Sequence, residues 1–252
     1  MRATLNAICV IYGRKIQKRY RQCIGLKQLK SMVGNYKLSF AGGEILLKKD
    51  VFEIFEICNR ENISFGVTTN GILLSSDNVN KLLEFNPMNI NISLDSLKND
   101  VYQQIRGVPA LEHVKSNIQY LMGHKEIGVK NIKVYFKTVV NNFNLNELHE
   151  IAQYAMDQKT AGITFDPIKR PLKLSMKTAE QFEAMTNIDK EQLQKAIRKL
   201  IHLKKQGFRI LNSENNMNQW FINRDANIGH FCTVPLQNFR LFRVCCTQNL
   251  VI

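Results

Sequence analysis

Short apolar runs alternate with amphipathic segments between about residues 36 and 167 of this chain. The runs are rich in β-branched and aromatic residues and have the length of strands. They cover residues 37–40, 65–69, 90–94, 132–139 and 162–165, with residues 4–11 as a sixth candidate. Regular alternation of strands with helices predicts βα units that build a parallel sheet.

The segments between and after the strands carry apolar residues at helical spacing. One stripe runs from Leu47 to Cys58, which places the Cys58 thiol in the core. A second stripe covers residues 145–155, where Asn144 is expected to cap the helix and Glu147 to complete a capping box. These patterns predict a helix after each of the two strands concerned.

The periodicity changes towards the C-terminal end. Apolar positions in residues 193–201 predict a helix that stops before Gly207, and polar residues 212–218 predict a loop. We therefore expect three parts, which are a partial βα barrel over residues 1–170, a helical bridge over 171–210 and an irregular tail over 211–252.

Composition narrows the class of protein. With 252 residues, 44% hydrophobic and 22% charged, the chain is globular and long enough for one large domain. It contains no apolar run of about 18 residues, the minimum for a membrane-spanning helix. Asn6 interrupts the apolar start and cations follow it, so we expect a cytoplasmic protein without a membrane partner.

The net charge and the cysteine content each leave two interpretations open. The net charge is +14, which suits nucleic acid, but the cations are scattered along the chain, so a solvated basic surface is the preferred interpretation. Six cysteines in a chain of this length are too sparse for a disulfide framework. Reduced thiols or metal ligands remain as alternatives.

Small polar groups follow the predicted strands. The sequences at these ends are Ala-Gly-Gly-Glu at 41–44, Thr-Asn-Gly at 69–71, Ser-Leu-Asp at 93–95 and Thr-Val-Val-Asn-Asn at 138–142. Ligands of parallel βα folds bind at the carboxyl ends of the strands. Paired glycines admit a ligand close to the backbone, and carboxylates accept hydrogen bonds from amines or hydroxyl groups. The alternative is that these glycines form ordinary turns and that Asp95 caps a helix.

In their order and spacing, these motifs resemble the radical S-adenosylmethionine superfamily, especially members with a C-terminal SPASM-type cysteine extension. The resemblance rests on residues 38–44 (LSFAGGE), 68–71 (TTNG), 91–96 (NISLDS) and 105–107 (IRG). It implies a partial (βα)6 barrel that cleaves S-adenosylmethionine reductively with a four-iron cluster.

The resemblance also implies roles for individual residues. Gly42, Gly43 and Glu44 would hold the methionine amino end, and Arg106 would pair with the carboxylate. Ser93 would lie near the ribose or methionine moiety, and Asn142 or Asn141 near the ribose. By their own chemistry, Asp95 and Ser93 suit ribose hydroxyl groups. The implied site therefore comprises Gly42, Gly43, Glu44, Asn70, Ser93, Asp95, Arg106 and Asn142.

The chain departs from the family at the cluster motif. The family places three cysteines as C-x3-C-x2-C after the first strand, and only Cys9 matches here. If Cys9 is the middle ligand, Leu5 and Tyr12 occupy the other two positions; if it is the last, Arg2 and Asn6 do. One thiolate cannot hold such a cluster, so we expect no catalytic cluster in the chain as given and only weak binding of S-adenosylmethionine.

Three cysteines near the end of the chain resemble the opening of a SPASM-type extension. They are Cys232, Cys245 and Cys246, and they are too few for a four-thiolate iron-sulfur site. The candidate metal ligands are thus Cys9 and these three residues.

Three function classes follow. The first is a radical S-adenosylmethionine enzyme, with a peptide as one candidate substrate, whose sequence lacks ligands through truncation or error. The second is a degenerate relative that serves as a scaffold or partner protein. The third is a basic nucleic-acid-binding protein, which the scattered cations disfavour.

Overall fold

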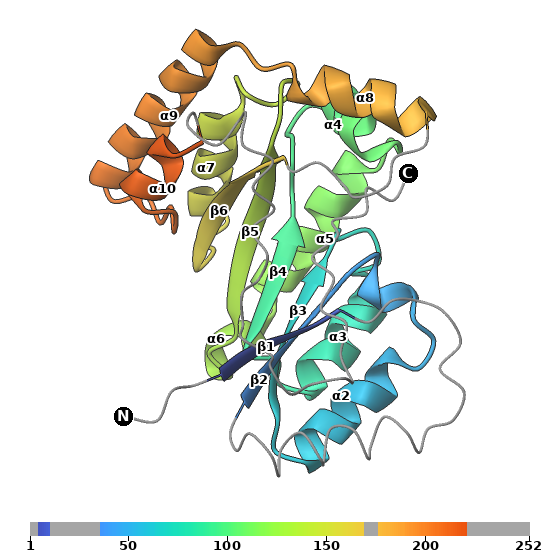
Figure 1. Ribbon diagram of the computed structural model, residues 1–252. Coiled ribbons are helices and arrows are strands. Elements are labelled where there is room, and N and C mark those ends of the chain that lie inside the picture. The colour runs from blue at the N-terminus through green and yellow to red at the C-terminus, as the bar shows by residue number, and fades with distance from the viewer. Residues whose placement is uncertain (1–4, 11–35, 169–175, 221–252) are drawn as a thin grey trace.

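The computed structural model describes residues 5–10, 36–168 and 176–220, and it contains a parallel sheet (Figure 1). Six strands pair in sequence order within these residues, each parallel to the next. They are β1 (Leu5–Val10), β2 (Tyr36–Ala41), β3 (Ser64–Thr69), β4 (Asn89–Ser93), β5 (Lys133–Val140) and β6 (Gly162–Pro167). All six predicted strands are confirmed. No pairing closes β1 on β6 in the described sheet, so the fold is a partial barrel.

Helices connect the strands and cover one face of the sheet, as Figure 1 shows. The connections between β2 and β6 contain η1 (Ile45–Leu47), α2 (Val51–Arg60), α3 (Ser76–Glu84), α4 (Asn99–Arg106), α5 (Leu111–Gly123), α6 (Lys125–Val129) and α7 (Leu148–Asp157). After β6 follow α8 (Met176–Thr186), α9 (Lys190–Lys205) and α10 (Glu214–Asn218). The α/β class expected from the sequence is therefore confirmed.

Aromatic rings join the sheet to its helices. The ring of Phe55 on α2 lies 4.7 Å from that of Phe65 on β3 and 5.5 Å from that of Phe40 on β2, between ring centroids. Because side chains alternate along a strand, Ser39 and its alternate neighbours face the opposite, concave side of the sheet. The core thus lies between sheet and helices, and polar positions line the concave face.

The outer edge of β6 is covered. Ile210 forms a parallel bridge with Ile163, and the side-chain amide of Asn212 both accepts from Phe165 N–H and donates to Phe165 C=O, each at 2.8 Å. The amide therefore acts as one more residue of a neighbouring strand. Such cover protects an edge that would otherwise pair with another chain.

The helix predictions after β6 are confirmed in part. α9 contains the predicted stripe of residues 193–201, and Gly207 follows its C-cap with a φ of 95°. The loop expected over residues 212–218 is wrong, because Ser213 caps α10 through a 3.1 Å bond from Asn216 N–H. The division into three parts remains a prediction. No helix among the described residues is long and apolar enough to span a membrane.

Candidate functional site

The Gly42–Gly43 turn follows β2 at its carboxyl end. Both glycines have positive φ, 111° and 49°, a region that costs other residues about 1–2 kcal/mol. A Cβ placed on Gly43 would meet no described atom within 4 Å. The backbone at Gly43 is therefore open to close approach by a ligand.

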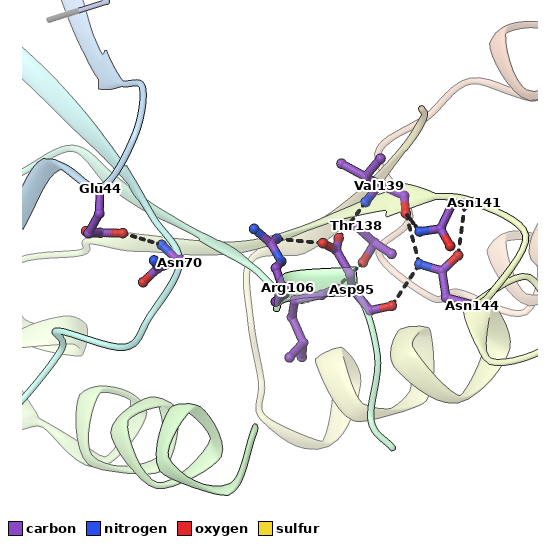
Figure 2. A network of polar contacts seen from close by, with 9 residues as sticks. Glu44, Asn70, Asp95, Arg106, Thr138, Val139, Asn141 and Asn144 are labelled. Carbon is purple, nitrogen blue, oxygen red and sulfur yellow. Dashed lines mark hydrogen bonds and ion pairs between the residues drawn. The ribbon is translucent and has the colours of Figure 1, made fainter. Parts of the chain in front are cut away.

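Glu44 ties this turn to the top of β3. Its carboxylate accepts hydrogen bonds from Thr69 Oγ1 at 2.8 Å, from Asn70 N–H at 2.7 Å and from Leu46 N–H at 3.2 Å. Figure 2 shows the Glu44 carboxylate directed at the Asn70 backbone. The predicted neighbours Glu44 and Asn70 are thus in contact.

The Asn70 side chain supports its own turn. Its Oδ1 accepts from Ile72 N–H at 2.9 Å, while the next residue, Gly71, has a φ of 84°. Asn117 on α5 donates to Gly71 C=O at 2.9 Å. The Asn70 amide therefore shapes the loop after β3, as the turn interpretation expected.

Asp95 and Arg106 form a partly buried ion pair. Arg106 Nη2 lies 2.6 Å from Asp95 Oδ2, and the other carboxylate oxygen accepts from Val139 N–H at 2.7 Å. The Asp95 side chain is only 3% exposed and that of Arg106 is 25% exposed. The alternative interpretation of Asp95 as a helix cap is wrong, because Lys98 occupies the N-cap of α4.

Two polar atoms beside this pair lack a partner in the described structure. Arg106 Nε and the hydroxyl group of Tyr102, one turn earlier on α4, are buried without a hydrogen bond. Burial raises the pKa of Tyr102, an effect opposed by the Arg106 charge and reinforced by Asp95. Buried polar groups are normally bonded, so the free Nε–H marks a position where an acceptor is missing.

The remaining predicted residues lie nearby on the ends of β4 and β5. Ser93 is the half-buried last residue of β4. Asn142 donates its backbone N–H to Met185 C=O on α8 at 2.8 Å. The fully buried Asn141 donates its amide to Val139 C=O and accepts from Phe143 N–H, so its side chain shapes the loop.

The structure therefore gathers the predicted residues into two groups. Glu44 contacts Asn70, and Asp95 contacts Arg106, but no hydrogen bond or ion pair joins these two groups within the described chain. Figure 2 shows Arg106 on the side of Asp95 that faces Glu44 and Asn70.

Asn144 and Glu147 also bond to the segment around Asp95. The sequence pattern had predicted that they cap a helix instead. The Asn144 amide donates to Asp95 C=O at 2.7 Å, and the Glu147 carboxylate accepts from Ser96 and Leu97. The predicted capping box is wrong, because α7 begins after Glu147 and the Asn144 side chain accepts from Asn141 N–H instead. Their polarity was the available signal, and pattern matching assigned it to the helix.

The cysteine ligands are tested only in part. Cys9 lies in β1 opposite Phe40, and Cys232, Cys245 and Cys246 lie outside the described residues. Cys58 is buried in the core, as predicted. No group of three or more potential metal ligands occurs in the described part of the chain. The residues described there do not fit a three-thiolate cluster site.

Comparison with protein families decides the identity of the fold. The family model described as the radical SAM superfamily matches residues 25–155, about half of the chain. This chain belongs to the radical SAM superfamily. The match contains the Gly-Gly-Glu turn, the Asp95–Arg106 pair and strands β2 to β5.

Curated relatives share part of this radical SAM chain. A probable GTP 3',8-cyclase of Methanocaldococcus jannaschii is 33% identical over 143 residues, which cover 56% of this chain and 46% of the relative. A GTP 3',8-cyclase of Clostridium perfringens strain 13 is 31% identical over 128 residues, covering 50% and 38%. The chain thus spans less than half the length of these relatives.

Solved structures support the same fold at low sequence identity. Streptococcus suis SuiB bound to S-adenosylmethionine gives a TM-score of 0.60 at 14% identity, covering 83% of this chain and 47% of SuiB. The structure of anSMEcpe with AdoMet and a peptide gives 0.63 at 14% identity, covering 82% and 63%. These likenesses confirm the partial barrel of radical SAM type.

Proposed function

We propose that this radical SAM chain binds S-adenosylmethionine at the ends of its strands. The observation that carries the proposal is Arg106, whose Nη2 is held by Asp95 while its buried Nε–H lacks an acceptor. A ligand carboxylate would supply that acceptor and gain a charge-assisted hydrogen bond. The similar structures of SuiB and anSMEcpe are described with bound S-adenosylmethionine, which supports this ligand.

The Gly42–Gly43 turn suits the amino end of this ligand. Gly43 leaves open space, and Glu44 is fixed by three donors so that the turn keeps its form. Ser93 and Asn142 remain the candidates for the ribose. Asp95 is reassigned, because both its oxygens already bind protein donors, and we infer that it holds Arg106 and does not bind a ribose hydroxyl group.

Calorimetry with S-adenosylmethionine tests this proposal. We expect weak binding to the unaltered chain and a loss of about tenfold or more in Arg106→Gln, which removes a charged hydrogen bond. Arg198→Gln on α9 is the matched control, because that exposed arginine bonds only to Gln194 in the described structure, and its binding should be unchanged. Absence of binding, or equal binding by Arg106→Gln, contradicts the proposal.

The iron-sulfur cluster of this superfamily supplies the electron that cleaves S-adenosylmethionine. Cys9 alone does not provide three thiolates, so we propose that the chain as given does not assemble a catalytic cluster unaided. Anaerobic reconstitution with iron and sulfide, followed by electron paramagnetic resonance after reduction, tests this. A four-iron signal that changes on adding S-adenosylmethionine would overturn it.

Two substrate classes follow from the comparisons. The curated relatives are named for GTP, whereas SuiB and anSMEcpe are described with peptides. Alternation along β5 places Lys137 on the concave face, beside Ser93 at the end of β4, whereas Lys37 lies near the amino end of β2 opposite Ser64. A cation beside the proposed site favours an anionic nucleotide over a neutral peptide, which becomes the second candidate. Calorimetry with GTP and with a neutral peptide, each in the presence of S-adenosylmethionine, distinguishes them.

A further inference from the structure

Glu147 is a buried carboxylate that the binding proposal does not use. It is 2% exposed, and its oxygens lie 3.1 and 2.9 Å from Ser96 Oγ. It also accepts from Leu97 N–H at 3.0 Å. Burying a carboxylate is costly without such donors, so this arrangement fixes both partners. The contact joins the start of α7 to a turn about fifty positions earlier in the chain.

The turn that Glu147 holds lies between the two members of the ion pair. Ser96 and Leu97 follow Asp95 directly and lead into α4, whose last residue is Arg106. The side chain of Ser96 also accepts from Lys98 N–H at 3.0 Å, which tightens the same turn. A displacement of this turn would therefore move both Asp95 and the helix that carries Arg106.

A second anchor comes from the same segment before α7. Asn144 Nδ2 donates to Asp95 C=O at 2.7 Å and to Val139 C=O at 2.9 Å. Asn144 thus fixes the beginning of the turn and Glu147 fixes its middle. Figure 2 shows Asn144, Asp95 and Arg106 as consecutive members of one polar network.

We infer that Glu147 is a positioning residue for the ligand carboxylate, acting through Asp95 and Arg106. This inference rests on the proposed function. The Glu147 carboxylate is turned towards Ser96 and Leu97, so its effect on the ligand is transmitted by the turn. By fixing the turn, it keeps Asp95 bonded to Arg106 Nη2, so that Nε–H stays available to the ligand carboxylate.

Three variants separate positioning from general stability. Glu147→Ala removes both contacts with the turn. Glu147→Gln keeps an acceptor for Leu97 N–H and offers its amide N–H to the Ser96 oxygen. It should therefore retain the ligand binding that Glu147→Ala loses. Asp189→Ala is the matched control, because Asp189 also precedes a helix and accepts from Gln192 N–H at 2.9 Å, but it caps α9.

Calorimetry with S-adenosylmethionine gives the first readout. We expect Glu147→Ala to bind about tenfold more weakly, as for loss of one charged hydrogen bond, with Glu147→Gln and Asp189→Ala close to the unaltered chain. Binding of 5'-methylthioadenosine, which lacks the carboxylate, should change little in Glu147→Ala. Equal losses for both ligands, or none for S-adenosylmethionine, would overturn the inference.

A ligand-free readout keeps this test separate from the proposed function. The Nε–H resonance of Arg106 in ¹⁵N-labelled protein, assigned by its loss in Arg106→Gln, reports the order of the guanidinium. We expect faster hydrogen exchange of this proton in Glu147→Ala and no change in Asp189→Ala. If the unaltered chain does not bind S-adenosylmethionine, the binding proposal fails, and unchanged exchange in Glu147→Ala would separately refute positioning. Should Glu147→Ala not fold, Ser96→Ala removes one donor from the same carboxylate and takes its place.

Discussion

Two carboxylates near the strand ends, Glu44 after β2 and Asp95 after β4, have different partners. Glu44 is half-buried and accepts from a hydroxyl group and two backbone N–H groups. Asp95 is buried and binds the Arg106 guanidinium at 2.6 Å together with one backbone N–H. The uncharged donors around Glu44 fix the conformation of a loop. In the Asp95–Arg106 pair, by contrast, each largely buried charge is stabilised by the opposite charge of its partner. The same residue class therefore shapes a turn in one region and holds a cation in the other.

This difference has an energetic consequence. Removing Glu44 leaves neutral donors, some of which water can reach because the carboxylate is half-buried. Removing Asp95 leaves a largely buried guanidinium without its counter-charge. Breaking a buried pair is more costly than losing neutral hydrogen bonds.

The largest expected effect is therefore at Asp95. Asp95→Ala should lower the free energy of unfolding by about 3 kcal/mol, at the low end for buried pairs because Arg106 is partly exposed. Glu44→Ala should lower it by about 1–2 kcal/mol. Urea unfolding followed by circular dichroism measures both, and a larger loss for Glu44→Ala would show that the two sites have been ranked wrongly.

An intermediate effect is expected at the glycines beside each loop. In Gly71→Ala, a residue with a Cβ must adopt a φ of 84°, and that Cβ lies only 3.0 Å from Val114 Cγ1. The free energy of unfolding should therefore fall by about 2–3 kcal/mol. In Gly43→Ala only the φ of 49° is unfavourable, so the free energy of unfolding should fall by about 1 kcal/mol. The same urea titration compares them.

Ligand binding sharpens the comparison of the glycines. Gly43→Ala places a methyl group in the open space proposed for S-adenosylmethionine, so its affinity should fall although its stability changes less than that of Gly71→Ala. Calorimetry on both folded variants tests this. Unchanged affinity in Gly43→Ala would remove the Gly-Gly turn from the proposed site.

The smallest effect concerns Tyr102 beside the Asp95–Arg106 pair. Its pKa is raised, mainly by burial, so the folded chain holds the phenolic proton more strongly than the unfolded chain, where the ordinary value is 10.0. This contribution to stability is complete below pH 10 and is lost as the pH rises through the folded-state pKa. Tyr102→Phe should remove the part of the alkaline destabilisation that comes from this group.

Unfolding free energies from neutral pH to above pH 10 check the Tyr102 prediction. A smaller alkaline slope should remain in Tyr102→Phe, because burial also raises the pKa of Tyr154. At neutral pH the variant should be as stable as the unaltered chain, since the Tyr102 hydroxyl group has no partner in the described structure. Parallel curves for the two proteins would show that Tyr102 does not titrate as stated.

Sequence pattern was sufficient for the strands and their order along the chain. Short apolar runs and helical stripes are local properties, so they predicted all six strands and the helix that ends before Gly207. Parallel order then placed the Gly-Gly-Glu turn and Asp95 at one end of the sheet. The one clear failure after β6 was α10, a single helical turn that Ser213 caps.

The tertiary structure decided which polar groups meet. Asn144 and Glu147 match a local capping box by spacing, yet their side chains bond to Asp95, Ser96 and Leu97 about fifty positions away. Asp95 matches a helix cap by the same logic and instead holds Arg106. These contacts depend on the register of β4 against β5, which sets the end of one strand beside the turn after the other. A local pattern can favour a contact within a turn. It contains no information on donors from distant parts of the chain, because only the assembled sheet brings these within hydrogen-bond distance.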